Sequence, residues 1–445
     1  MNNRTKHDHQ KMPEQVTIHG LSHDGRGIAN ILNKTTFIAG ALPQESVTYR
    51  IHQKKSNYME GEALEILTPS PERATPPCPH FGVCGGCSLQ HMNIDLQTSL
   101  KEKTLLEQLT HFGKVTPKEV LSPLQSTGTG YRRKARLGVK FVIKKDKLLV
   151  GFREKSSRYL ADLTQCKVLY PRVGEHLETF AALIRSMDCY MDIPQIEVAV
   201  GDETAALVFR HLKPLSADDL MKLSDFGKEH TFNIYLQPNP PAPVSKLYPS
   251  DGNDRLTYTL PDFDLEFLFH PLDFTQINLG MNRLMVRQAI NLLELTPNDT
   301  VLDLFCGIGN FTLPIARHAK EVIGIEGAEE MTVRAGDNAA HNHIHNIQFF
   351  AANLMNPPVS AHWLNREYDK ILLDPPRAGA IEILPHLARM NASRIVYISC
   401  NPATLARDAG ELCNKYGYQL QKVGIMNMFP HTSHIEAMAV FERIK

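Results

Sequence analysis

The chain has 445 residues, a net charge of zero and a hydrophobic fraction of 42%, which excludes a disordered protein and one that is basic throughout. At about 100–200 residues per domain, this length predicts two to four domains. No run of about 20 apolar residues occurs, and the first 15 residues lack the apolar segment of a secretion signal. We therefore expect a cytoplasmic protein that does not enter a membrane.

Residues 15–67 form short apolar segments that are separated by glycines and polar pairs. Short strands at regular spacing are typical of a small β-barrel. A proline-rich stretch from Pro69 to Pro79 follows and predicts a linker.

The eight cysteines are unevenly distributed, and three of them lie within ten residues. Cys78, Cys84 and Cys87 form a C-x5-C-x2-C pattern, and Cys166 is a candidate fourth ligand far along the chain. Four thiolates suit either tetrahedral zinc or a [4Fe–4S] cluster. The spacing alone does not distinguish the two.

Residues 93–112 have helical periodicity, and the region up to residue 270 alternates strands with helices. From Tyr131 to Arg158, eleven lysines and arginines stand against two acids, with aromatic residues between them. This pattern favours a surface for nucleic acid over an ordinary solvated face.

From about residue 271, short apolar strands alternate with helices. The strands are expected at 301–305, 321–326, 347–353, 370–376 and 394–400. This repetition predicts an α/β domain with a parallel sheet covered on both faces. Two further strands, around 420–428 and 435–443, are expected to pair antiparallel at the end of the chain.

The segment VLDLFCGIGN (301–310) predicts a strand, a glycine turn and a helix start. Gly307 and Gly309 allow a ligand to approach the backbone, and Glu326 closes the next strand, where a carboxylate can accept both ribose hydroxyls. Thr312 replaces the third glycine of a dinucleotide fingerprint. An adenosyl cofactor is therefore favoured, and the alternative is a tight turn that binds nothing.

Two motifs end the fourth and fifth strands: DPPR (374–377) and SCNP (399–402). Ligands of open α/β sheets bind at these strand ends, so Cys400 is a candidate nucleophile and DPPR a candidate amine site. A lone cysteine is more often a buried structural thiol. Glu436, in the HIE segment 434–436, is a weak candidate for a general base on its own.

Together these segments and FTQIN (274–278) resemble the RNA uracil-C5 methyltransferases, in the family's order along the chain. The resemblance implies a class I, Rossmann-like fold and S-adenosyl-L-methionine as methyl donor. It implies that Cys400 adds to C6 of uracil and that Glu436 removes the proton from C5. The same matching gives the residues expected to contact the methyl donor: Gln276, Phe305, Asn310, Glu326, Asn353 and Asp374.

The N-terminal half resembles the iron–sulfur members of this family that carry a TRAM domain, an oligonucleotide-binding-type barrel, and that act on 23S ribosomal RNA. The resemblance implies a [4Fe–4S] cluster on Cys78, Cys84, Cys87 and Cys166. The expected domains are a TRAM barrel (12–68), a mixed α+β central domain with the cluster loop 78–87 (69–270) and a methyltransferase domain (271–445). In that family the helix around 93–120 packs on the catalytic domain.

The expected function is therefore methylation of a uridine in 23S ribosomal RNA by a monomer. The alternatives are a second site in that RNA, a transfer RNA, an amino-methyltransferase that uses DPPR, and an iron–sulfur protein that binds RNA without chemistry.

Overall fold

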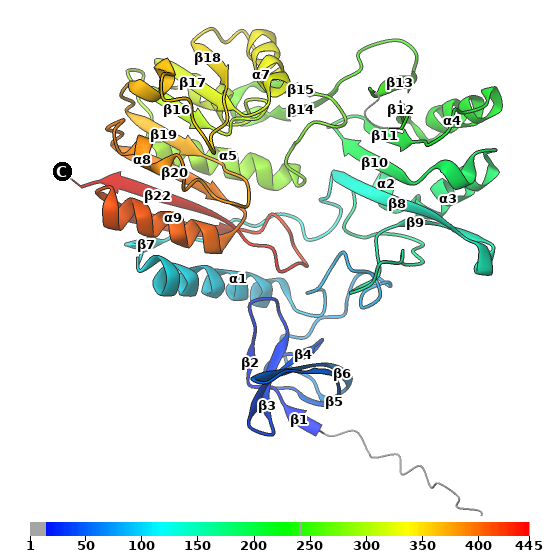
Figure 1. Ribbon diagram of the computed structural model, residues 1–445. Coiled ribbons are helices and arrows are strands. Elements are labelled where there is room, and N and C mark those ends of the chain that lie inside the picture. The colour runs from blue at the N-terminus through cyan, green and yellow to red at the C-terminus, as the bar shows by residue number, and fades with distance from the viewer. Residues whose placement is uncertain (1–14, 240–242, 445) are drawn as a thin grey trace, which may run out of the picture.

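The computed structural model describes residues 15–239 and 243–444 and contains four β-sheets. Residues 12–14 of the expected barrel and Lys445 of the expected catalytic domain lie outside the described residues. Figure 1 shows the barrel below a larger body, in which the C-terminal α/β part lies beside a second sheet.

The N-terminal sheet has six strands in the order β1-β5-β6-β4-β3-β2. Its strands alternate buried and exposed side chains, as in β3, so that one set of side chains fills a small core around Ile38 and Val47. The strands are β1 (Gln15–Thr17), β2 (Gly20–Leu21), β3 (Gly27–Ile31), β4 (Lys34–Ala39), β5 (Ser46–Lys54) and β6 (Tyr58–Thr68).

A buried carboxylate fastens this barrel to the linker that follows it. Glu45 is fully buried and accepts hydrogen bonds from the backbone of Leu42 and Ser70 and from the Arg73 guanidinium at 2.5 Å. These donors outweigh the effect of burial and hold the pKa of Glu45 below its usual value.

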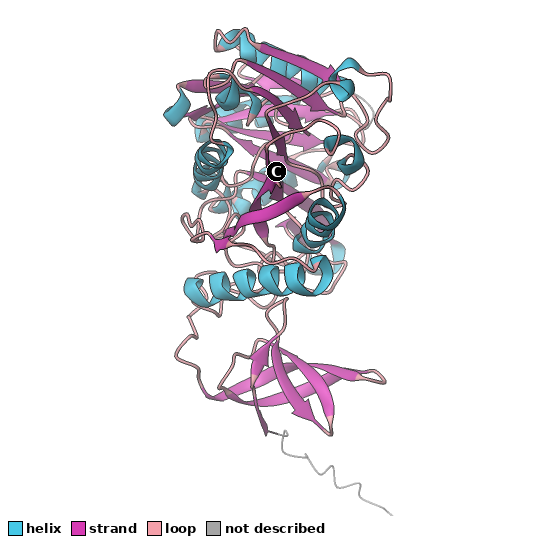
Figure 2. Cartoon of the chain, turned by 90° about the vertical axis from the view of Figure 1, so that its left-hand side faces the viewer, coloured by secondary structure: helices cyan, strands magenta, loops and turns pink. Residues whose placement is uncertain are grey.

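Helix α1 (Ile94–Gln108) lies between the barrel and the rest of the molecule (Figure 2). Asn93 caps its first turn by accepting from the backbone N–H of Leu96. One π-helical turn (Leu109–Gly113) extends it, and the chain leaves the helix at Lys114 in a left-handed conformation. Leu105 and Leu109 are fully buried and belong to the hydrophobic core of the C-terminal sheet. Helix α1 therefore packs on the catalytic part, although it precedes the central sheet in the chain.

The central sheet has the order β13-β12-β11-β10-β8-β9, and its core includes side chains of α3 and α4. Its elements are β8 (Lys134–Val142), β9 (Lys147–Gly151), α2 (Pro171–Gly174), α3 (Leu177–Ser186), β10 (Gln195–Val200), β11 (Ala205–Arg210), α4 (Ala217–His230), β12 (Phe232–Gln237) and β13 (Ser245–Tyr248). Short 3₁₀ turns occur at 143–145, 190–192, 261–263 and 362–365.

A hairpin of β14 (Leu256–Leu260) and β15 (Leu265–Phe269) follows. Its side chains share a hydrophobic core with α5 and with the C-terminal sheet, and this core also reaches Val208 and Tyr235 of the central sheet. The domain boundary at residue 270 stays a prediction, because the hairpin contacts both sides of it.

The C-terminal sheet has eight strands in the order β18-β17-β16-β19-β20-β22-β21-β7. The five strands from β18 to β20 are parallel, and β22 joins β20 and β21 antiparallel. The strand order reverses between β16 and β19, and ligands of open α/β sheets bind at such a reversal.

The elements of this part agree with the expected strand–helix alternation. They are β7 (Glu119–Val120), α5 (Leu279–Leu293), β16 (Thr300–Leu304), α6 (Thr312–Ala316), β17 (Glu321–Glu326), α7 (Glu329–His341), β18 (Ile347–Ala351), β19 (Lys370–Leu373), α8 (Leu384–Leu387), β20 (Arg394–Ser399), α9 (Pro402–Lys415), β21 (Tyr418–Met426) and β22 (Glu436–Arg443). The prediction of an α/β, class I methyltransferase fold is confirmed by this arrangement.

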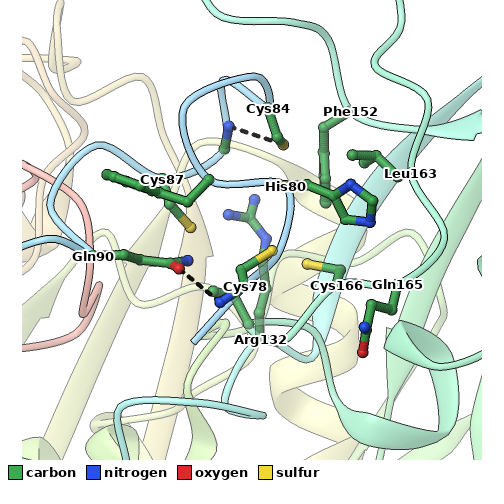
Figure 3. Close-up of a pocket in the computed structure, with 13 residues that line it drawn as sticks. Cys78, His80, Cys84, Cys87, Gln90, Arg132, Phe152, Leu163, Gln165 and Cys166 are labelled. Carbon is green, nitrogen blue, oxygen red and sulfur yellow. Dashed lines mark hydrogen bonds between the residues drawn. The ribbon is translucent and has the colours of Figure 1, made fainter. Parts of the chain in front are cut away.

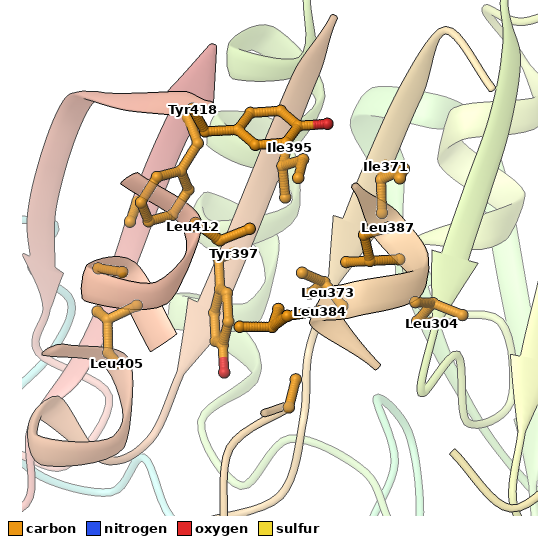
Figure 4. Close-up of a cluster of buried hydrophobic side chains, with 14 of the residues drawn as sticks. Leu304, Ile371, Leu373, Leu384, Leu387, Ile395, Tyr397, Leu405, Leu412 and Tyr418 are labelled. Atoms are coloured by element: carbon orange, nitrogen blue, oxygen red, sulfur yellow. The ribbon is translucent and has the colours of Figure 1, made fainter. Parts of the chain in front are cut away.

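One face of the C-terminal sheet packs against α8, α9 and α1. Figure 4 shows leucine, isoleucine and tyrosine side chains of β19, β20 and α9 filling the space between sheet and helices. Tyr397 is fully buried and donates its hydroxyl to Asp408 of α9 at 2.6 Å. This core supports the strand ends that carry Asp374 and Cys400.

Among the described residues, no helix is both long enough and apolar enough to cross a membrane.

We expect Leu373→Ala to destabilise the fold by about 2–5 kcal/mol, because Leu373 is fully buried and its removal leaves a cavity next to the site. Chemical denaturation with fluorescence detection measures the change. Ile143→Ala is the control, since Ile143 is 79% exposed and its truncation should change stability by no more than about 0.5 kcal/mol. Equal stability of the two variants would contradict the assignment of this core.

Candidate active site and cysteine centre

A cavity of about 1100 Å³ opens at the carboxyl ends of β16, β17, β19 and β20. The loop 270–277 before α5 and the loop that leads into β22 complete its wall. The glycine turn after β16 and the DPPR segment after β19 both line this cavity, as expected for motifs at the ends of parallel strands.

The glycine turn shapes one end of the cavity. Phe305 has a φ of 66°, which is unusual for a residue with a Cβ atom, and Gly307 and Gly309 also have positive φ. At Gly309 a Cβ atom would lie 2.5 Å from Leu313, so that position requires glycine for space as well. The turn therefore exposes backbone rather than side chain to a ligand.

The carboxylate of Glu326 is oriented by backbone donors at the same end of the cavity. It accepts hydrogen bonds from the N–H groups of Gly307 at 3.0 Å, Gly327 at 2.7 Å and Ala328 at 3.3 Å. A carboxylate held in this way beside a glycine turn is suited to accept the two hydroxyls of a ribose. The cavity thus has the chemistry of an adenosyl site.

Four of the six residues expected to contact the methyl donor line the cavity: Gln276, Phe305, Glu326 and Asp374. The other two do not line it. Asn310 exchanges two side-chain hydrogen bonds of 2.9 Å with Asn282, and Asn353 is exposed and accepts from the backbone of Met355. Roles for Asn310 and Asn353 in cofactor binding stay predictions.

The expected nucleophile and base meet through strand pairing. Cys400 directly follows β20, and Glu436 is the first residue of β22. The antiparallel register pairs Ser399 with Ala437. Cys400, which follows Ser399, and Glu436, which precedes Ala437, therefore lie at the same edge of the sheet. Both side chains line the cavity together with Asp374.

Burial shifts the pKa values of all three groups upward in the absence of substrate. It raises the pKa of Glu436 to about 8 and that of Asp374 to about 7, and Asp374 raises Glu436 further. Burial and the two carboxyls raise the pKa of Cys400 to about 11, and Arg377 acts in the opposite direction. These shifts favour the thiol form of Cys400. A nearby cation such as Arg377 acts in the opposite direction and favours its thiolate.

Cys400 also lines a second hollow, of about 340 Å³, between the catalytic part, α1 and the barrel. Arg377 and His434 line both hollows, and the Arg377 guanidinium lies 2.9 Å from Nδ1 of His434. His23, from the loop after β2 of the barrel, lines the second hollow too. The sulfur of Cys400 thus belongs to two connected spaces, one of which the barrel helps to build.

Sequence reasoning missed a buried lysine near the base. Lys101 of α1 is 2% exposed, and it is electrostatically coupled to Glu436. The available signal was its position on the same helix face as Leu105, where a charged side chain is unusual.

The four cysteines expected to bind a metal lie around one cavity of about 210 Å³ (Figure 3). Their side chains point toward one another, three from the loop 78–87 and one from the segment after Leu163. Gln90 accepts from the backbone of Cys78, and Gly86 donates to the sulfur of Cys84. The fold therefore brings together residues that are 79 positions apart in the chain, Cys87 and Cys166.

The four sulfur atoms line one cavity without forming a close set of three. Within the described residues, no three of these sulfurs lie within 4.8 Å of one another, and none is in a disulfide. Sulfurs bound to one tetrahedral zinc ion would be about 3.8 Å apart at the usual Zn–S length of about 2.3 Å. Burial raises the pKa of the Cys87 thiol to about 12, so a thiolate there needs a strongly positive partner.

The basic segment 131–158 is used in two ways. Lys134 turns inward and donates to the carbonyls of Pro271 and Asp273 at 2.6 Å, and Arg133 donates to the carbonyl of Gly201. The Lys134 ammonium and the backbone N–H of Arg133, which donates to the carbonyl of Ile277, fasten the central sheet to the loop that lines the cavity. Most of the other lysines and arginines of the segment are exposed to solvent. They are Arg136, Lys140, Lys144, Lys145, Lys147, Arg153, Lys155 and Arg158. The prediction that this whole segment faces RNA is therefore wrong for Arg133 and Lys134.

Comparison with known families agrees with this geometry. Residues 253–444 match the tRNA (Uracil-5-)-methyltransferase family, and residues 14–64 match the TRAM domain. Among solved structures, the Pyrococcus abyssi tRNA (uracil-54, C5)-methyltransferase in complex with S-adenosyl-L-homocysteine superposes with a TM-score of 0.73. It is 24% identical, and the match covers 96% of this chain and 100% of that one. Fold and cavity together define a class I, S-adenosylmethionine-dependent methyltransferase.

Close relatives extend over nearly the full length. The 23S rRNA (uracil(1939)-C(5))-methyltransferase RlmD of Hahella chejuensis is 50% identical over 442 residues, which is 98% of this chain and 99% of the relative. The protein of the same description from Alkalilimnicola ehrlichii is 49% identical over 97% of both chains. The chain belongs to the RNA uracil-C5 methyltransferase family and to its TRAM-containing members.

We expect Glu326→Gln to weaken binding of S-adenosylhomocysteine by about tenfold to a hundredfold, because it removes one charged hydrogen-bond acceptor for the ribose. Isothermal titration calorimetry measures the dissociation constant. Glu329→Gln is the matched control, since this exposed acid at the start of α7 is not part of the cavity wall. Unchanged affinity of Glu326→Gln would contradict the ribose role of this carboxylate.

Proposed function

We propose that this protein methylates C5 of uridine 1939 in 23S ribosomal RNA and yields 5-methyluridine. The observation that carries the proposal is the adjacency of Cys400 and Glu436 in a cavity that also holds the adenosyl-binding turn. The choice of RNA is supported by relatives about 50% identical over nearly their whole length, which bear that description.

In the proposed reaction, the Cys400 thiolate adds to C6 of the uracil. This addition gives C5 the electron density of an enolate. C5 would then take the methyl group of bound S-adenosylmethionine as the S–CH3 bond breaks and S-adenosylhomocysteine leaves. Arg377 favours the thiolate, since it lowers the pKa of Cys400 against the effect of burial.

The Glu436 carboxylate then removes the proton from C5. The electron pair of the C5–H bond forms the C5=C6 double bond, and the Cys400 thiolate leaves C6. Both residues lie at one edge of the sheet, so a uracil held between them can reach the two groups from a single position.

The uracil must leave its stack to enter the cavity, at a cost of a few kcal/mol. Phe274, from the FTQIN segment, lines the cavity and is 70% exposed, which suits stacking on an unpaired base. Asp374 is the candidate partner for the polar edge of the uracil. Since burial raises its pKa to about 7, it can be protonated and donate a hydrogen bond near neutral pH.

Two surfaces are proposed to hold the RNA around the target. The second hollow carries the strand past Cys400, with His23 of the barrel on its wall. The exposed cations of the segment 136–158 neutralise phosphates, which makes binding weaken as salt increases. One chain contains both proposed catalytic residues and both surfaces, so a monomer suffices. The proposed domains are the barrel to residue 68, the central domain with the cluster loop, and the catalytic domain with α1 packed on it.

For the cysteine centre we propose a [4Fe–4S] cluster held by Cys78, Cys84, Cys87 and Cys166. Four converging thiols without a carboxylate or a disulfide fit this group, and the lack of a close set of three among these sulfurs favours it over a single zinc ion. When bound, the cluster joins the loop 78–87 to the central domain and so supports the surface next to α1. The proposed role is structural, because methyl transfer requires no electron.

We expect the wild-type protein to form a covalent adduct with 23S RNA fragments in which the target is 5-fluorouridine, since fluorine at C5 cannot be removed as a proton. Cys400→Ala should form no adduct and should methylate normal RNA at less than about one ten-thousandth of the wild-type rate. Denaturing electrophoresis and transfer of labelled methyl groups measure the two effects.

Cys413→Ala is the control, because this thiol is on α9 and does not line the cavity. An adduct that forms equally well with Cys400→Ala would contradict the covalent mechanism. Full methyl transfer by Cys400→Ala would favour the amino-methyltransferase alternative, in which DPPR binds an amine.

We expect protein purified without oxygen to be brown and to contain about four iron atoms per chain. Cys84→Ser should lose most of this iron and the visible absorption, whereas Cys189→Ser, outside the cysteine cavity, should keep both. Iron analysis and visible spectroscopy test this. A colourless protein with one zinc ion per chain would overturn the assignment.

A further inference from the structure

Lys101 is a charged residue at the centre of the interface between α1 and the catalytic part. It is 2% exposed and is among the largest fully buried side chains of the protein. An unpaired buried ammonium is costly, so its burial requires a specific environment. That environment is the chain segment that leads into the proposed base.

The Lys101 ammonium donates to two oxygens of the segment between β21 and β22. These are Oδ1 of Asn427 at 2.8 Å and the carbonyl of Phe429 at 3.0 Å. One helical turn earlier, Gln97 fastens the same segment by accepting from the backbone N–H of His431 at 2.8 Å. Helix α1 thus holds residues 427–431, a few positions before Glu436.

The charged and titratable groups that face Glu436 come from four elements. Lys101 of α1, Asp374 and Arg377 after β19, and Cys400 after β20 are electrostatically coupled to Glu436. Before β22, His434 lines the same cavity, and His431 is coupled to Lys101. Asp374 favours the neutral form of Glu436, whereas Lys101 and Arg377 favour the carboxylate. Arg377 also acts on Cys400 and contacts His434, whereas the hydrogen bonds of Lys101 go to the segment that leads into Glu436.

The location of one proton decides whether the base is active. Burial raises the pKa of Glu436 to about 8 and lowers that of Lys101 to about 7, so both shifts place the proton on the carboxyl. The two carbonyl oxygens around Nζ act against this, because an ammonium donates to both of them and a neutral amine binds them less strongly. These two hydrogen bonds therefore favour the ammonium form of Lys101, whose positive charge in turn favours the carboxylate of Glu436.

We propose that Lys101 is a positioning residue for the reaction: its buried ammonium anchors the segment before β22 and favours the carboxylate form of Glu436, which takes the proton from C5. This inference rests on the proposed function and assigns to α1 a part in catalysis.

The step that depends on Lys101 is the last one. Methyl transfer leaves an adduct in which C5 carries both the methyl group and its proton, and C6 is bonded to Cys400. The Glu436 carboxylate takes the proton, the C5–H electron pair forms the C5=C6 double bond, and the thiolate leaves. Without the lysine charge this step slows, whereas methyl transfer before it does not require the base.

The test uses Lys101→Met, which keeps the length of the side chain and removes its charge. RNA with tritium at C5 of the target uridine and a carbon-labelled methyl donor report two events in one single turnover. In the wild type, tritium release and methyl transfer should keep pace. In Lys101→Met, tritium release at pH 7 should be about tenfold slower than methyl transfer, for a rise of about one unit in the pKa of the base.

The pH dependence has a defined sign. A higher pKa of Glu436 leaves less carboxylate at pH 7, so the acid limb of tritium release should move to higher pH by about one unit in Lys101→Met. Lys101→Arg keeps a cation and should restore the wild-type limb. Lys103→Met is the matched control, because Lys103 lies on the same helix with a 72% exposed side chain.

Each outcome decides between roles. A delayed release with a shifted limb that arginine restores supports the inference. The inference is overturned if Lys101→Met slows tritium release and methyl transfer equally and keeps the wild-type pH dependence. It is also overturned if the pH dependence stays shifted in Lys101→Arg. In either case the effect would be one of packing. If Lys101→Met fails to bind S-adenosylhomocysteine, Lys101→Gln carries the same test. Failure of the wild type to methylate the RNA would instead refute the proposed function.

Discussion

The antiparallel pairing of β22 with β20 is the interaction on which the site depends. A parallel sheet alone places ligands at the ends of successive strands, and here those ends supply the glycine turn, Asp374 and Cys400. The last strand of the chain inserts between β20 and β21 in the opposite direction, so that its first residue, Glu436, arrives at the same edge. A carboxylate and a thiol that are 36 positions apart thereby become neighbours in one cavity.

Helix α1 is the second structural support of that edge. It packs with Leu105 and Leu109 in the catalytic core, although the central sheet follows it in the chain. Its polar side chains Gln97 and Lys101 hold the segment that precedes β22. Leu42 of the barrel packs with Leu89 and Met92, which lie just before α1, and the barrel places His23 at the second hollow. Packing and hydrogen bonds thus link the barrel, α1 and the segment before Glu436.

The cysteine centre and the basic segment connect the central domain to this arrangement. The four cysteines, from the loop 78–87 and from a distant part of the central domain, line one cavity. The Lys134 ammonium and the backbone of Arg133 bind the loop 271–277 to the central sheet. The Lys134 ammonium, which would be solvated in an isolated central domain, thus forms hydrogen bonds between the central sheet and the cavity loop. The remaining exposed cations stay available for phosphates.

The sequence by itself determined the α/β pattern, the barrel, the glycine turn with Glu326, and the motifs that carry Asp374 and Cys400, because these are local patterns of apolar residues and turns. It also determined the family, since its motifs occur in a fixed order. Only the tertiary structure decided which side chains meet. Asn310 and Asn353 lie beside the motifs but do not line the cavity, because neighbouring polar groups engage their side chains. Lys101 is buried near Glu436, and Arg133 and Lys134 point inward. Packing between segments that are distant in sequence sets this burial, so no local sequence pattern encodes it.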